Sequence, residues 1–337
     1  TGTSFRLGIQ SRSRKVYPSV GLGDYRTQST PMKDLLVYET ELGEMHCADS
    51  LAFMRGLKEA SVDLVMTSPP YALHFKKEYG NADQHEYIAW MLPFAAEIKR
   101  ILKPEGSFVL NIGGAWTPGK PVRSLYHFRL LLALCDEVGF HLAQEMFWYN
   151  PAKMPAPAEW VNVQRIRVKD SVEYLFWLSK TPRPKANNNN VLLPYSRDMQ
   201  RLVARGVKQS VRPSGHVIKS SFTSENAGSI PSNLIQCGNN ESNSNYIRGS
   251  KEKGTQIHPA RFPAELPRFF IRFLTDPGDL VLDPFAGSNT TGAVAETLGR
   301  RWLGVEINES YARDSELRFS DPDLLRNGQV KLQESLL

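Results

Sequence analysis

Short, mostly apolar runs alternate with longer amphipathic stretches along this chain. The short runs lie at 35–38, 44–47, 62–67, 107–112, 280–282 and 302–305, and each predicts a strand. The amphipathic stretches at 86–102, 125–138 and 264–274 predict helices, as do the segments after residue 50 and through 293–298. Two further runs, 141–149 and 171–179, predict strands. This order predicts an α/β fold with a mostly parallel, doubly wound sheet.

Two segments lack this periodicity and carry most of the positive charge. Residues 1–33 hold 6 basic and 1 acidic residues, and residues 181–255 hold 11 and 4. The remainder holds 24 basic and 30 acidic residues. We therefore expect four parts: a basic arm at 1–33, a first catalytic half at 34–180, an insertion at 181–256 and a second half at 257–337. Basic appendages on an acidic body predict a polyanionic partner.

Composition excludes several other classes. None of the 337 residues belongs to an apolar run of about 18, so no membrane span is expected. The first residues contain no apolar core of a secretory signal. Three cysteines, Cys47, Cys135 and Cys237, are far apart and lack the spacing of metal ligands. We expect a reducing compartment and no metal site.

The run at 62–67 ends abruptly at Ser68, Pro69, Pro70 and Tyr71. Neither proline can donate to a sheet, so the chain must turn there, at the edge of an open α/β sheet where ligands bind. The free carbonyls and the Ser68 hydroxyl can accept hydrogen bonds from an amino group, and the Tyr71 ring can face a planar base. Such a corner could also be a turn and nothing more.

A second corner follows the run at 280–282. The sequence Asp-Pro-Phe-Ala-Gly-Ser at 283–288 leads into a helix, which predicts a nest of backbone N–H groups for an anion such as a carboxylate. Glu306 ends the next strand 23 residues after Asp283, where a carboxylate can accept both ribose hydroxyls. Any βαβ unit also favours glycine in this turn. The chain lacks Gly-x-Gly-x-x-Gly, which disfavours a nicotinamide cofactor.

Both corners resemble motifs of one family. Ser-Pro-Pro-Tyr resembles the catalytic motif of the amino-methylating DNA methyltransferases, in the form typical of enzymes that act on cytosine N4. The second corner at 283–288, together with Gly-Val-Glu at 304–306, resembles the cofactor motif of the same family. The catalytic motif comes first, by 212 residues, as in the permuted β-group. Residues 212–216 and 228–231 are similar to segments of the PvuII-type enzymes. The resemblance covers about residues 34–315, and it implies a circularly permuted, Rossmann-like fold that binds S-adenosyl-L-methionine.

The resemblance also implies roles for particular residues. Catalytic roles fall on Ser68, Pro69, Pro70 and Tyr71. Cofactor contacts fall on Asp49, His258, Pro259, Asp283, Pro284, Phe285, Gly287, Ser288, Thr290 and Glu306. Contacts with DNA or the flipped base fall on Trp148, Tyr149, Arg212 and His216. Asp49 fits a helix N-cap equally well, and the aromatic pair fits an ordinary core. Some family members carry aspartate where this chain has Asn111, which puts a proton relay to that position in doubt.

We therefore expect a site-specific methyltransferase that modifies the N4 amine of a flipped cytosine in double-stranded DNA. The alternatives are adenine N6 methylation, RNA methylation, and a non-catalytic nucleic-acid-binding module with a vestigial cofactor pocket. No cysteine follows a proline as a C5-cytosine enzyme would require. Such enzymes usually belong to microbial restriction-modification systems, which implies a cytoplasmic, nucleoid-associated protein; a eukaryotic host would imply the nucleus. The sequence leaves a homodimer open.

Overall fold

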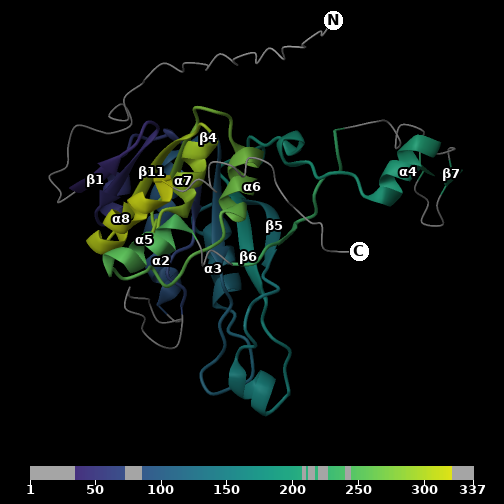
Figure 1. Cartoon of the computed structure of the whole chain (residues 1–337), viewed down its shortest axis with the longest axis horizontal. Helices are drawn as coiled ribbons and strands as arrows, with labels where there is room; N and C mark the ends of the chain where they lie inside the picture. The colour runs from purple at the N-terminus through teal and green to yellow at the C-terminus, as the bar shows by residue number, and fades with distance from the viewer. Residues whose placement is uncertain are drawn as a thin grey trace, which may run out of the picture.

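The computed structural model describes residues 35–72, 86–206, 210–211, 217–218, 227–239 and 244–320. Within these ranges nine strands form one sheet in the order β1-β2-β11-β10-β3-β4-β6-β5-β9 (Figure 1). The strands are β1 (Leu35–Glu39), β2 (Gly43–Cys47), β3 (Val62–Thr67), β4 (Leu102–Ile112), β5 (His141–Tyr149), β6 (Val172–Ser179), β9 (Leu234–Gln236), β10 (Leu280–Asp283) and β11 (Arg301–Glu306).

The centre of the sheet is parallel. Strands β2, β11, β10, β3 and β4 all run in one direction, so their carboxyl ends meet at one edge. Antiparallel pairs occur at β1 with β2 and on both sides of β6, while β9 runs parallel to β5. The predicted mostly parallel sheet is confirmed.

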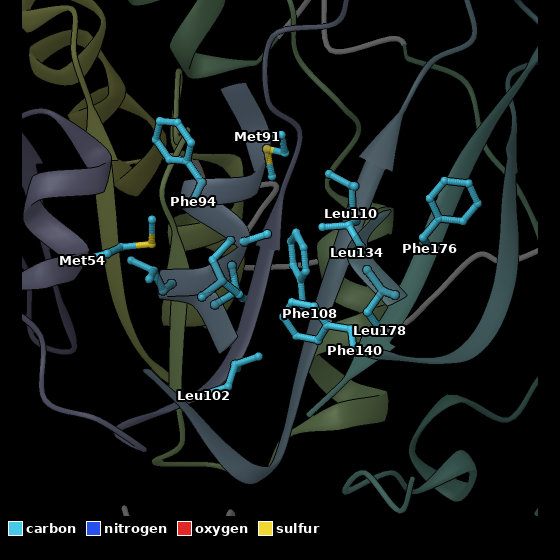
Figure 2. Packing of buried hydrophobic residues seen from close by; sticks show 14 of the residues in the cluster. Met54, Met91, Phe94, Leu102, Phe108, Leu110, Leu134, Phe140, Phe176 and Leu178 are labelled. Atoms are coloured by element: carbon cyan, nitrogen blue, oxygen red, sulfur yellow. The ribbon is translucent and has the colours of Figure 1, made fainter. Parts of the chain in front are cut away.

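Helices cover both faces of the sheet, which confirms the doubly wound prediction. One core contains β4 side chains together with α1 (Ser50–Arg55), α2 (Tyr87–Ile101) and α3 (Tyr126–Asp136). Figure 2 shows this packing around Phe108 and Leu110. The other core contains α6 (Glu265–Leu274) and α7 (Thr290–Thr297). Strand β6 serves both cores because alternate side chains point to opposite faces: Leu175 lies in one core and Phe176 in the other.

One predicted boundary is wrong. A turn was expected at 103–106, with the strand beginning at 107, but β4 already begins at Leu102. Val62 pairs with Leu102, and Leu64, two residues on, pairs with Ser107. The four residues 103–106 therefore bulge out of a strand that has already begun to pair.

The segment predicted as an insertion is only partly separate from the sheet. It contains η3 (Asn188–Val191), α4 (Arg197–Arg205), the pair β7 (Ser210–Val211) and β8 (Val217–Ile218), strand β9 and helix α5 (Asn245–Lys253). Helix α4 lies well away from the sheet (Figure 1). By contrast β9 extends the sheet, and α5 packs against η5 (Ser315–Ser320) in the second half. The exact domain boundaries stay a prediction, and the arm at 1–33 lies outside the described residues.

Two loops, 113–125 and 150–171, together form a projection that we call the carboxyl-edge lobe. They leave the carboxyl ends of β4 and β5, and the second contains η2 (Glu159–Val163). Figure 1 shows this lobe extending away from the sheet. Arg123 pairs with Asp170 at 2.9 Å, and the rings of Trp116 and Trp160 are 6.5 Å apart. These contacts join the two loops into one unit.

In the described part of the chain, no helix is long and apolar enough to cross a membrane. No group of three or more histidine, cysteine or acidic residues is placed to hold a metal ion there either.

Candidate functional site

A cavity of about 640 Å³ lies at the carboxyl edge of the parallel strands, and both predicted corners line it. The Ser-Pro-Pro-Tyr corner follows β3, the glycine corner follows β10, and Glu306 ends β11. The cavity brings together most of the predicted site residues: Asp49, Ser68, Pro69, Pro70, Tyr71, Trp148, His258, Pro259, Pro284, Phe285, Gly287, Ser288, Thr290 and Glu306. Asp283 and Tyr149 are not in its wall, and Arg212 and His216 lie outside the described residues.

The amine corner is a hydrogen-bonded unit. Ser68 Oγ lies 3.2 Å from Tyr71 Oη, which lies 2.8 Å from Glu173 Oε2 and 3.2 Å from Asn111 Oδ1. The phenol has one proton to donate. The Glu173 carboxylate is both the closer and the stronger acceptor, so Tyr71 donates its hydrogen bond to Glu173. Burial raises the pKa of Tyr71 well above its usual value, and the charge of Glu173 adds to this, so the phenol stays neutral. A Cβ at Gly113 would lie 2.5 Å from Tyr71 Cε2, so glycine at 113 makes room for the ring.

Glu173 and Lys153 are site residues that the sequence predictions missed. Lys153 Nζ lies 2.8 Å from Glu173 Oε1, so the two carboxylate oxygens of Glu173 face Lys153 and Tyr71. Both residues line the cavity. The available signal was the position of Glu173 itself, a single carboxylate in the apolar and aromatic run of β6.

The cofactor corner is organised by Gly287 and Glu306. Gly287 has φ +52°, a left-handed conformation that favours glycine, and an added Cβ would lie 3.0 Å from the His258 ring. Its N–H donates to Glu306 Oε2 at 2.9 Å, while Glu306 Oε1 accepts from the Asn308 N–H at 2.9 Å. Burial raises the pKa of Glu306. The predicted anion nest is therefore altered, because the N–H of Gly287 already binds a carboxylate.

A buried cation lies behind this corner. Arg318 Nε donates to the Ser288 carbonyl at 2.6 Å, and Nη2 donates to Ser288 Oγ at 2.9 Å. Arg318 is only 2% exposed and its guanidinium lies 4.8 Å from the centre of the Tyr246 ring. This contact was not predicted, since 30 residues separate Arg318 from Ser288.

The wall between the two corners is aromatic. The ring of Phe285 lies 5.8 Å from Trp90 and 5.2 Å from Phe94, and all three line the cavity. Trp90 and Phe94 belong to α2, and the apolar spacing of this helix had predicted them only as core residues. Flat apolar surfaces, a carboxylate for ribose hydroxyls and a glycine corner backed by a guanidinium are the groups that an adenosyl amino acid requires. The residues present therefore fit S-adenosyl-L-methionine.

The N-cap interpretation of Asp49 is confirmed, while its contact with the cofactor stays a prediction. Its Oδ1 accepts from the Ala52 N–H at 2.8 Å, which caps α1, and the residue also lines the cavity.

Asp283 supports the two corners from inside the protein and does not line the cavity, so its predicted contact with the cofactor stays a prediction. Its carboxylate accepts from Thr67 Oγ1 at 2.6 Å, Thr291 Oγ1 at 2.7 Å and the Phe285 N–H at 3.1 Å. Burial raises its pKa to about 6. Since Thr67 immediately precedes Ser68, Asp283 connects the two corners beneath the cavity.

The aromatic pair of β5 divides between two faces. Trp148 lines the cavity, and its Nε1 donates to the Cys237 carbonyl at 3.0 Å. Tyr149 does not line the cavity, because neighbouring side chains on a strand point to opposite faces. Trp148 therefore lies at the cavity, and a contact of either residue with the flipped base stays a prediction.

Comparison with known proteins gives three findings. Residues 62–317 match the family model described as DNA methylase. The chain is 51% identical to the Type II methyltransferase M.PvuII of Proteus hauseri over 85% of this chain and 86% of that protein, and 27% identical to the DNA adenine methyltransferase YhdJ of Escherichia coli over 79% and 78%. A solved PvuII DNA methyltransferase, cytosine-N4-specific, superposes with a TM-score of 0.71 at 44% identity, covering 89% of this chain and 92% of that one.

Proposed function

Since this chain belongs to the DNA methylase family, we propose that it transfers a methyl group from S-adenosyl-L-methionine to the exocyclic N4 amine of cytosine in double-stranded DNA. The observation that carries this proposal is the single cavity lined by both Ser68 and Gly287. Serine in the first motif position and the 44% identity to a cytosine-N4-specific structure favour cytosine over adenine.

We assign the amine to the Ser-Pro-Pro-Tyr corner. Ser68 Oγ and the carbonyls around Pro69 and Pro70 accept the hydrogens of the amine and aim its lone pair into the cavity. Tyr71 presents its ring to the base. When bound, S-adenosyl-L-methionine supplies the methyl group, whose bond to sulfur breaks as the bond to the amine nitrogen forms. The protein therefore contributes mainly position and hydrogen bonds.

The other corner holds the cofactor in this proposal. Glu306 would accept hydrogen bonds from the ribose hydroxyls through the remaining lone pairs of its oxygens. Phe285 and Phe94 would supply apolar surfaces for the adenine. Gly287 and Ser288 would hold the amino acid end, with the positive charge of Arg318 behind Ser288.

The target cytosine must leave the duplex, because a paired N4 cannot enter a cavity walled by Ser68 and Trp148. The carboxyl-edge lobe suits the flanking DNA. It holds six basic and two acidic residues, and Lys120 and Arg165 are exposed on it. Lys153, from the same lobe, lines the cavity. We propose that the lobe contacts phosphates while the predicted insertion reads bases.

Chromatography of nucleosides tests the proposal. DNA is incubated with protein and methyl-labelled S-adenosyl-L-methionine, then digested, and the label is expected in N4-methylcytosine. Label in N6-methyladenine would support the second candidate, which the adenine-specific relative of Escherichia coli favours. Label in RNA alone, or in no nucleic acid, would contradict the proposal. In a microbial host we place the reaction at the nucleoid, in a restriction-modification system.

A further inference from the structure

We propose that Glu173 is the group that receives the proton released by the methylated amine, through Ser68 and Tyr71. The inference rests on the proposed function, since it concerns the proton that this reaction must discard. It assigns a chemical role to Glu173, which belongs to neither the catalytic motif nor the cofactor motif.

The geometry forms a continuous path. Ser68 Oγ lies at the corner assigned to the amine, 3.2 Å from Tyr71 Oη. Tyr71 Oη donates to Glu173 Oε2 at 2.8 Å. Each step is within hydrogen-bond reach, so a proton can pass from hydroxyl to hydroxyl to carboxylate. Tyr71 acts as a relay and never as a phenolate, because burial and the charge of Glu173 raise its pKa.

Asn111 occupies the competing position but cannot do this chemistry. Its Oδ1 lies 3.2 Å from Tyr71 Oη, and its Nδ2 donates to the Tyr174 carbonyl at 3.2 Å. An amide oxygen accepts a hydrogen bond but is not protonated at neutral pH. Glu173 comes from a different strand and supplies the carboxylate that position 111 lacks.

Lys153 forms an ion pair with Glu173 at the end of the path. Its ammonium lies 2.8 Å from Glu173 Oε1, on the side of the carboxylate away from Tyr71. The ammonium pairs with one oxygen of the carboxylate and leaves the other oxygen to Tyr71. The side chain of Lys153 is 34% exposed and that of Glu173 is 14% exposed. The ion pair therefore lies between the buried relay and water.

The proton balance is as follows. After methyl transfer the target nitrogen carries a positive charge, and it loses one proton to Ser68 Oγ while the N–H electron pair returns to nitrogen. Ser68 passes its own hydroxyl proton to Tyr71 Oη, and Tyr71 passes its proton to Glu173 Oε2. Ser68 and Tyr71 end neutral as they began. Glu173 ends as a carboxylic acid, and it then releases the proton to water.

Single-turnover kinetics test the relay. Glu173→Gln keeps the size of the side chain and its hydrogen bond to Tyr71, but it cannot take the proton. We expect methyl transfer to slow about 10- to 100-fold, with the Kd values for S-adenosyl-L-methionine and for DNA within about twofold of wild type. The acidic limb of the pH–rate profile should also disappear. Glu145→Gln, an exposed carboxylate on β5, is the matched control and should leave the rate unchanged.

Two further variants separate the relay from a structural role. Tyr71→Phe should slow transfer as much as Glu173→Gln, and the double variant should be no slower than either, because both interrupt one path. Adding Asn111→Asp to Glu173→Gln should restore part of the rate by placing a carboxylate beside Tyr71 Oη. Wild-type rates in Glu173→Gln, additive losses in the double variant, or no rescue would overturn the inference. Failure of the wild type to methylate DNA would instead refute the proposed function.

Discussion

Replacing Asp283 with asparagine tests the support beneath the two corners. The side chain is buried, and it accepts hydrogen bonds from Thr67, Thr291 and the backbone of Phe285. Asparagine has nearly the same size and keeps one acceptor oxygen, but it carries no charge at any pH. The comparison therefore isolates the cost of burying the carboxylate.

The magnitude follows from the raised pKa. Burial raises the pKa of Asp283 from 3.8 to about 6. Between these values the folded protein keeps a proton that the unfolded chain releases, so the free energy of unfolding falls as pH rises. The contribution is present in full below about pH 4 and is lost as pH passes about 6. A shift of about two pKa units corresponds to about 3 kcal/mol in all, of which about 1 kcal/mol is lost between pH 5 and pH 7.

Urea unfolding of wild type and Asp283→Asn at pH 5, 6 and 7 measures this difference. The stability of wild type relative to the variant should decline by about 1 kcal/mol across the series. Asp198→Asn removes an exposed carboxyl on α4 and shows the effect of losing one charge alone. A difference between wild type and Asp283→Asn that stays constant, or grows with pH, would refute the reasoning.

Three further predictions concern activity and binding. Ser68→Ala should lower kcat about 10- to 100-fold through loss of a hydrogen bond to the amine, with the Kd for S-adenosyl-L-methionine nearly unchanged, and equal losses in both would contradict the assignment. Glu306→Gln should weaken cofactor binding about tenfold in calorimetry, because the ribose hydroxyls lose a charged acceptor, and an unchanged Kd would exclude this role. Lys120→Glu combined with Arg165→Glu should weaken DNA binding. The slope of log K against log salt concentration should become shallower, by the release of about two fewer counterions. The control Lys58→Glu, which lies before the amino end of β3, should show the same salt dependence of DNA binding as wild type. If wild type, the double variant and the control all show the same salt dependence, the lobe does not contact DNA.

The sequence predicted the central strands well because β3, β10 and β11 are buried on both faces. Strand β3 has every residue buried, and its mainly apolar sequence was visible directly. The bulge at 103–106 was not predictable, because it depends on which residue of β3 pairs with Leu102. The place of β9 in the sheet was missed for a similar reason: three residues in a polar segment pair with β5 only through the tertiary fold.

The site was predictable where residues are adjacent in the chain. Ser68, Tyr71 and Gly287 were found because each belongs to a short motif, and the comparisons confirm the family that the motifs indicated. Glu173 lies 102 residues from Tyr71, so only folding brings them together. Asp283 was predicted to contact the cofactor because of its motif, and only the folded chain shows that its side chain turns inward to Thr67.

The central claim is that one cavity holds the methyl donor and the target amine, and a crystal structure with S-adenosyl-L-homocysteine tests it most directly. We predict the adenine beside Phe285, the amino acid end at Gly287, and the sulfur facing the Ser68 hydroxyl across open space large enough for a cytosine amine. A ligand bound outside this cavity, or a sulfur directed away from Ser68 with Phe285 between them, would contradict the account.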